Sequence, residues 1–117
     1  MEDIPKHIIK IAFELNQQLL NSISEKSSLS LEDKFNITAQ IFEEIEEELS
    51  SVNLSTTKLK VESSHFEVFK YNDSNNYGIE ASLFTNDGKI TDLTINTELV
   101  INKSEQYHLN YRLIEIM

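Results

Sequence analysis

The sequence predicts a single α+β domain, 1–117, in which two N-terminal helices pack on one face of a four-stranded antiparallel meander sheet. Two observations predict this class. Apolar residues recur every three or four positions over residues 4–49, and they alternate with polar residues from Leu59 onward. Turn-forming segments separate the alternating stretches, so consecutive strands are expected to pair with one another. A chain of 117 residues, of which 39% are apolar, is long enough to bury a core without disulfides.

The first predicted helix covers residues 4–23. Pro5 lies in its first turn, where a missing N–H group is harmless. The apolar stripe of this helix is wide and consists of Ile4, Ile8, Ile9, Ile11, Ala12, Phe13, Leu15, Leu19, Leu20 and Ile23. We therefore expect much of its circumference to be buried.

The second predicted helix begins near Ser30 and continues to Leu49, after a polar connector at Ser24–Ser30. Its apolar stripe is Leu31, Phe35, Ala39, Phe42, Ile45 and Leu49. The segment FEEIEEEL within it carries five glutamates in six positions. At about 100° per residue, Glu43, Glu44, Glu47 and Glu48 project away from the stripe, and Glu46 lies at its margin.

Period-two patterns predict the strands. The first strand starts at Leu59, and a shift of the apolar phase at Ser63–His65 predicts a β-bulge there. The second and third strands, Tyr77–Phe84 and Leu93–Ile101, flank an Asp-Gly hairpin turn at Asn86–Lys89. The fourth strand is Tyr107–Leu113, and turn formers fill the remaining connections at Tyr71–Asn76 and Asn102–Glu105. The sheet face opposite the helices is expected to be largely solvated and carries Glu80, Ser82, Phe84, Thr94, Asn96, Glu98, His108, Asn110 and Arg112.

The net charge of −10 disfavours nucleic acids and anionic membranes as partners and favours a cationic protein. Acidity for solubility alone is the simpler explanation. The chain contains no cysteine, which excludes disulfides and thiolate chemistry and fits a reducing compartment. Its opening residues, MEDIPKHIIKIAFELNQQLL, resemble neither a signal peptide nor a membrane span, so we expect a cytoplasmic location.

No catalytic, cofactor or metal signature is present. The glycines are isolated, and the three histidines lie in different predicted elements. Asp73–Gly78 starts like a calcium loop, but Tyr77 and Phe84 occupy positions that require oxygen ligands. We therefore expect a protein that is not an enzyme.

Two surfaces are candidate partner sites. Glu43, Glu44, Glu47 and Glu48 are like charges at i,i+4 spacing near a helix C-terminus, which weakens the helix. Such clustering indicates either a partner surface or a solvated face. The second candidate is Phe84 with Glu80 and Glu98, an aromatic residue flanked by acids. Phe84 could instead cover a sheet edge, or the alternation could slip near the turn.

The segment YGIEASLFTNDGKITDLTI, Tyr77–Ile95, resembles one found in small, poorly characterised bacterial proteins, although those carry Trp where this chain has Phe84. The acidic, cysteine-free, helix-then-sheet design is similar to immunity proteins of bacterial toxin systems, including contact-dependent inhibition. The resemblance implies an inhibitor that binds a cationic toxin domain, such as a nuclease. The alternative is a small-ligand binding module or scaffold subunit, with Tyr77, Tyr107 and Tyr111 lining a pocket between sheet and helices.

Overall fold

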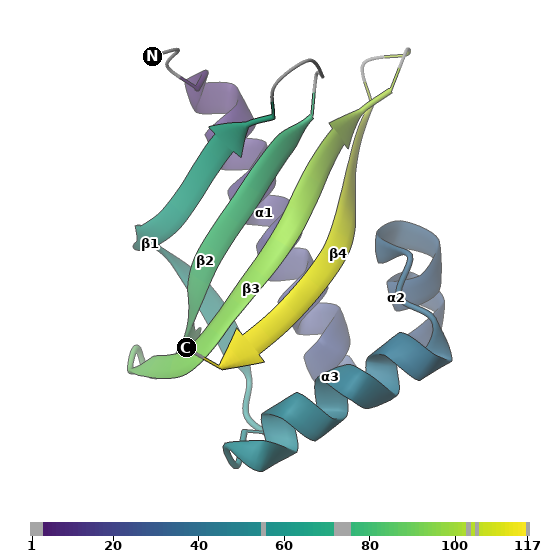
Figure 1. Ribbon diagram of the computed structural model, residues 1–117, viewed down its shortest axis with the longest axis vertical. Coiled ribbons are helices and arrows are strands. Elements are labelled where there is room, and N and C mark those ends of the chain that lie inside the picture. Colours follow the sequence, from purple (N-terminus) through teal and green to yellow (C-terminus); the bar gives the residue numbers. More distant parts are fainter. Residues whose placement is uncertain (1–3, 55, 72–75, 103, 105, 117) are drawn as a thin grey trace.

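The computed structural model of the chain describes residues 4–54, 56–71, 76–102, 104 and 106–116. Its helices are α1 (Lys6–Glu25), α2 (Ser28–Phe35) and α3 (Ala39–Ser51), and its strands are β1 (Leu59–Lys70), β2 (Tyr77–Thr85), β3 (Ile90–Ile101) and β4 (Tyr107–Ile116). The strands pair antiparallel in the order β1-β2-β3-β4 (Figure 1). The predicted α+β class, with N-terminal helices and a four-stranded meander, is confirmed.

The prediction of one continuous second helix is wrong, because the chain breaks at residues 36–38 and forms α2 and α3 separately. Asn36 adopts a left-handed conformation with φ of 58°, which asparagine tolerates better than most residues. Thr38 then caps α3, since its hydroxyl accepts a hydrogen bond from the Ile41 N–H at 3.3 Å. Ile37 between them is buried in the core at 2% exposure, so the break is itself anchored by packing.

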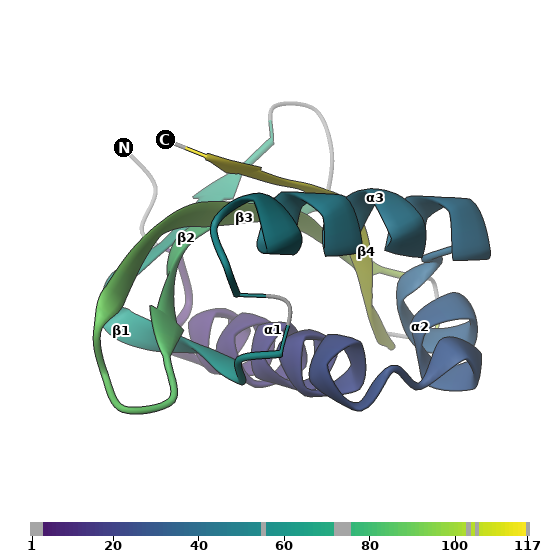
Figure 2. The ribbon, with the colours of Figure 1, turned by 90° about the horizontal axis from the view of Figure 1, so that it is seen from below.

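The helices divide between a face of the sheet and one of its edges. In Figure 1, α1 runs behind the strands, and it packs mainly against β1. The shorter helices α2 and α3 both contact β4, the opposite edge strand. In Figure 2, α3 lies above α1 and apart from it. Ile45 and Leu49 of α3 still contribute to the core.

A buried polar link joins α1 to the sheet. Asn16 is fully buried, and its amide nitrogen donates to the Ala12 carbonyl at 2.7 Å. Its amide oxygen accepts a hydrogen bond from the Thr97 hydroxyl of β3 at 3.0 Å. Both polar side chains are therefore satisfied inside an otherwise apolar core, as most buried polar groups are.

The irregular features predicted for the sheet are largely confirmed. The β1–β2 register shifts between Val61 and Phe66, which is the predicted bulge. At the predicted Asp-Gly turn, Gly88 has φ of 92°, and the Thr85 N–H donates to the Lys89 carbonyl at 2.8 Å. The predicted turn and the rejected calcium loop at residues 71–78 lie partly outside the described residues, as does the turn at 102–105.

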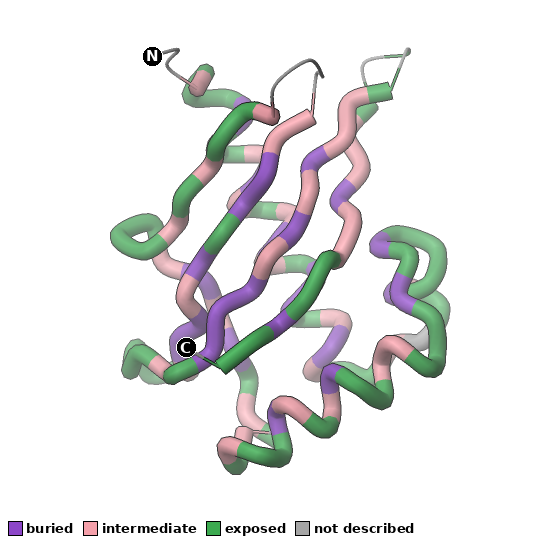
Figure 3. The backbone as a smooth tube through the Cα atoms, viewed as in Figure 1, coloured by how far each residue is buried: buried purple, intermediate pink, exposed green. Residues whose placement is uncertain are grey.

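The sheet face opposite α1 is more covered than expected, since two of the residues predicted to be solvated there are buried. Figure 3 colours each residue by its burial. Phe84 is only 8% exposed and Thr94 only 2%. The β1 bulge brings the His65 ring edge-on to Phe84, with ring centroids 5.3 Å apart. The expectation of an exposed Phe84 is therefore wrong. Phe84 does point away from the core, because it pairs with Lys60 next to the buried Leu83, but a neighbouring strand covers it.

An aromatic ring also covers Gly78 of β2. Gly78 pairs with Phe69 across the β1–β2 ladder, and the Phe69 ring lies over it. A Cβ atom at position 78 would overlap a ring carbon of Phe69 unless that ring moved. The aromatic ring therefore fills the space that a side chain on β2 would otherwise take.

Candidate functional site

Helix α3 presents a strongly acidic surface beside the sheet. Glu43, Glu44 and Glu47 are exposed, and Glu46 and Glu48 are half-buried. Among the described residues, none of these glutamates forms an ion pair. The helix has no basic residue in its last turn to balance them. The predicted separation of an acidic side from a core side is confirmed, because Ile45 and Leu49 are buried.

Part of this acidic side faces β4 across an open groove with a volume of about 460 Å³. We call it the acidic groove; it is lined by Ile41, Glu44, Glu47 and Glu48 of α3 and by Tyr111, Arg112, Leu113 and Ile114 of β4. Three of the four α3 glutamates predicted to bind a partner thus share one concave surface. Glu43 lies on the same helix but outside the groove lining.

A bulge in β4 shapes its side of the acidic groove. The β3–β4 register shifts at this point, because Asn96 pairs with Leu113 while the adjacent Thr97 pairs with Tyr111. Arg112 is the extra residue, and the local bend carries it and Leu113 outward. Leu113 is 42% exposed, so the groove offers apolar surface next to its acids.

Tyr111 closes the edge of β4 within the acidic groove. Its hydroxyl oxygen accepts a hydrogen bond from the Ile114 N–H at 2.8 Å. Burial raises the pKa of Tyr111 to about 12; the Ile114 hydrogen bond opposes this rise, and the nearby charges of Glu44 and Glu48 add to it. The phenol therefore stays neutral at physiological pH and occupies an N–H that an incoming strand would need.

Arg112 connects the acidic groove to the outer face of the sheet. Its Nη1 atom lies 3.3 Å from Glu98 Oε1, and the Glu98 carboxylate also accepts a hydrogen bond from Asn76 at 3.1 Å. The Glu98 side chain is only 17% exposed, whereas that of Arg112 is 56% exposed. Glu98 is therefore paired and largely covered, which makes it a poor steering charge.

The second predicted surface does not form one exposed patch. Phe84 is buried, and it pairs with Ile90 near the β2–β3 turn, whereas Glu98 pairs with Gly78. Phe84 and Gly78 are six positions apart along β2, a distance of about 20 Å. Only Glu80 is freely exposed, opposite Asn96 on β3. Sequence alternation correctly placed these residues on one face but could not reveal what covers them.

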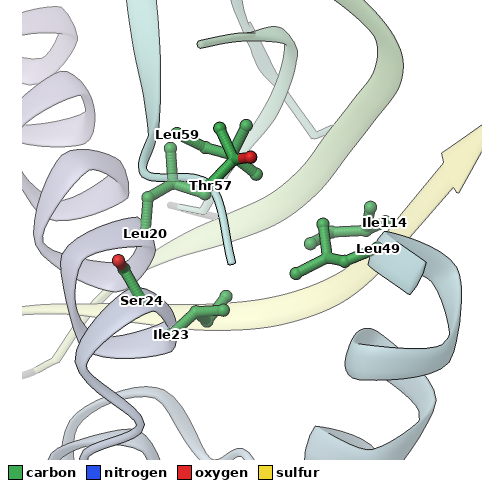
Figure 4. A pocket seen from close by; sticks show the side chains of 7 residues that line it. All are labelled: Leu20, Ile23, Ser24, Leu49, Thr57, Leu59 and Ile114. Carbon is green, nitrogen blue, oxygen red and sulfur yellow. The ribbon is translucent and has the colours of Figure 1, made fainter. Parts of the chain in front are cut away.

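The space between helices and sheet contains a small cavity, shown in Figure 4. Its volume is about 10 Å³, and its lining is Leu20, Ile23, Ser24, Leu49, Thr57, Leu59 and Ile114. A cavity of that size holds one water molecule at most. Tyr77 and Tyr107 pack against the core, and Tyr111 lines the acidic groove, so the three tyrosines proposed for a ligand pocket do not line this cavity.

Two of the histidines contact neighbouring polar or aromatic side chains. His108 contacts the Asn36 side chain at 3.2 Å, and His65 contacts Ser64 at 3.0 Å as well as the Phe84 ring. Over the part of the chain that the structure describes, no three His, Asp or Glu side chains are grouped so that they could hold a metal ion. Within the same residues, no helix combines the length and apolarity needed to cross a bilayer.

The acidic groove thus combines carboxylates that form no ion pair among the described residues, a neutral phenol and exposed aliphatic surface, supplied by a helix and an edge strand. Such a surface can accept hydrogen bonds and ion pairs from lysine or arginine side chains while contacting their apolar neighbours. Comparison with known protein families and with curated proteins gives no match to this sequence.

Proposed function

We propose that this protein is an immunity protein, a non-enzymatic inhibitor that binds a cationic toxin domain, such as a nuclease, through the acidic groove. The observation that carries the proposal is that Glu44, Glu47 and Glu48 line a groove with exposed apolar surface and form no ion pair with any other described residue. Like charges on one helix repel each other, and their position near a helix C-terminus adds to the cost. A cationic partner would relieve both effects on binding.

The chemistry of a nuclease makes it a suitable partner. An enzyme that binds phosphates needs a basic surface, and a row of carboxylates imitates the polyanion that such a surface accepts. The net charge of −10 would speed diffusional capture in the cytoplasm of the producing cell. Leu113 and Ile41 would then supply desolvated contacts, which control how long the complex lasts.

The proposed contact surface contains fewer residues than the set predicted from sequence. Glu44, Glu47 and Glu48 line the groove, and Glu43 adds charge on the same helix. Glu80 would contribute only to the long-range field, since it lies on the exposed sheet face. Phe84 is buried and Glu98 is paired with Arg112, so neither belongs to the proposed contact surface.

Affinity purification from the native organism tests the function directly. A tagged protein should recover one abundant basic protein at low salt and retain it at high salt, because short-range contacts survive screening. The purified partner should lose its toxic activity when the complex forms. Recovery of no basic partner, or complete loss of the partner at modest ionic strength, would contradict the proposal.

Charge reversal tests the site. Replacing Glu43, Glu44, Glu47 and Glu48 by lysine changes the net charge from −10 by +8, to −2. The matched control reverses four exposed acids elsewhere, Glu25, Glu32, Asp33 and Asp92, and gives the same net charge. Stopped-flow association with the partner should slow about 10- to 100-fold more for the α3 variant than for the control. Equal slowing would mean that overall charge, and not the acidic groove, captures the partner.

A further inference from the structure

A second groove lies at the other edge of the sheet, between the first half of α1 and the β1 bulge. It has a volume of about 430 Å³ and is lined by Lys6, Ile9, Lys10, Phe13, Glu14, Ser63 and Phe66. We call it the lysine-rimmed groove. It shares no residue with the acidic groove.

The floor of the lysine-rimmed groove is apolar and ordered by aromatic packing. The rings of Phe13 and Phe66 meet edge to face, with centroids 5.2 Å apart. Ile9 precedes Phe13 by one helical turn and is 39% exposed, so it extends the same surface. The β1 bulge opens the space above this floor, because residues 62–65 leave the β1–β2 ladder between Val61 and Phe66.

The rim carries positive charge in an otherwise acidic protein. Lys6 and Lys10 are both exposed and lie one turn apart on the same side of α1. Neither forms an ion pair among the described residues. Glu14 also lines the groove, so the three charged residues of the lining sum to a formal charge of +1, against −10 for the whole chain. The groove is thus a local cationic site beside an aliphatic and aromatic surface.

We propose that the lysine-rimmed groove binds a small monoanionic amphiphile, a carboxylate carried on an unbranched hydrocarbon chain. The hydrocarbon would cover Ile9, Phe13 and Phe66, and the carboxylate would lie between Lys6 and Lys10. A single negative charge suits the groove because Glu14 repels a second one. A small ligand suits it because a large anionic partner, or an anionic bilayer, would meet the repulsion of the remaining acidic surface.

Decanoate below its micelle concentration is the probe, titrated into the ¹⁵N-labelled protein and followed by amide chemical shifts. Saturable shifts are expected at the N-terminal half of α1 and in residues 61–66, with the amides of α3 unchanged. Decanol, which keeps the chain but lacks the charge, should bind about tenfold more weakly, and acetate should not bind. Decanol that binds as well as decanoate, or shifts centred elsewhere, would overturn the proposal.

Variants of the rim separate this site from general hydrophobic adsorption. The double substitution Lys6→Gln and Lys10→Gln should weaken decanoate binding about tenfold, while Lys34→Gln with Lys89→Gln, at exposed sites outside the groove, should leave it unchanged. Glu14→Gln should strengthen binding about threefold by removing the repelling charge. Unchanged amide spectra of the free variants would show that each one folds. Wild-type affinity in the Lys6/Lys10 variant, or weaker binding by Glu14→Gln, would refute the site.

The proposal is independent of the immunity function. Decanoate binding requires no toxin partner, and capture of a cationic partner involves the other edge of the sheet. Either proposal can therefore be refuted without affecting the other.

Discussion

The two edge strands of the sheet, β1 and β4, resemble each other in backbone structure, but the grooves beside them differ in charge. Each has an irregular register, each lies beside a helix, and each borders a groove, of about 430 Å³ at β1 and about 460 Å³ at β4. A bulge at a sheet edge both blocks pairing with other strands and creates space beside it. The helix next to the bulge then determines the charge, since α1 supplies lysines and α3 supplies glutamates. Backbone irregularity thus forms the grooves, and helix sequence selects what they attract.

The two helices are also attached differently. Helix α1 has 20 residues and a buried hydrogen bond from Asn16 to β3. Helix α3 has 13 residues, of which only Ile45 and Leu49 are buried. Among the described residues, no hydrogen bond joins a side chain of α3 to the sheet. We therefore expect the acidic groove to adjust on binding more readily than the lysine-rimmed groove.

The largest effect is expected at the buried link of α1. Asn16→Leu should lower the free energy of unfolding by about 2 kcal/mol, because it leaves the buried Thr97 hydroxyl without its acceptor. Urea denaturation measures the loss. Hydrogen exchange should show faster opening of α1 than in the wild type, with β3 and β4 changed less.

The double variant Asn16→Leu with Thr97→Val is the control for this link. Replacing both polar partners by apolar groups removes the unsatisfied hydroxyl, so the pair should be more stable than the Asn16→Leu variant alone. Strict additivity of the two single losses would contradict the view that Asn16 and Thr97 act as a unit.

An intermediate effect is expected at Tyr111, on the other edge. Tyr111→Phe removes the hydrogen bond to the Ile114 N–H and should cost about 1 kcal/mol near neutral pH. The pKa of Tyr111 is raised from 10.0 to about 12 in the folded protein. Below pH 10 both states keep the proton and this group adds no pH dependence. Between pH 10 and 12 the unfolded chain loses its proton first, so stability falls.

The pH dependence gives the measurement for Tyr111. The stability difference between wild type and Tyr111→Phe should shrink as pH rises from 9 to 11.5, by less than about 2 kcal/mol because solvent partly screens the site. Tyr107→Phe serves as the control for general alkaline destabilisation. A difference that stays constant with pH would mean that burial does not hold the Tyr111 proton.

The sequence predicted local features well and tertiary ones poorly. The strands, the Asp-Gly turn and the β1 bulge all follow from period-two patterns and residue types within a few positions. The helix break was missed because Ala39 and Phe42 continue the apolar spacing of Leu31 and Phe35, although Asn36 and Thr38 carry the capping chemistry.

The candidate sites also divide into local features, which the sequence predicted, and features that depend on long-range contacts, which it did not. The acidic side of α3 is visible in FEEIEEEL, because it depends only on helical periodicity. The β4 wall of the acidic groove, and the cover over Phe84, depend on strands far away in sequence. In the sequence, Asn16 is only a polar residue that interrupts an apolar stripe. Its hydrogen-bond partner, Thr97, lies 81 positions further along the chain. Such long-range pairs leave no local pattern to find.

The smallest effect on stability is expected at Arg112. Its substitution also tests the difference in charge between the two edges of the sheet. Arg112 is the one cationic side chain among the described residues that line the acidic groove. Arg112→Gln removes an exposed pair with Glu98 and should change stability by less than about 0.5 kcal/mol. If the proposed function holds, it should nevertheless speed association with the cationic partner about two- to threefold at low salt and not at high salt. Lys34→Gln changes the net charge equally but lies outside the groove, so an equal gain from both variants would assign steering to overall charge. A gain confined to Arg112→Gln would mean that the field within the acidic groove guides the partner, and that its arginine moderates an attraction that the glutamates of α3 create.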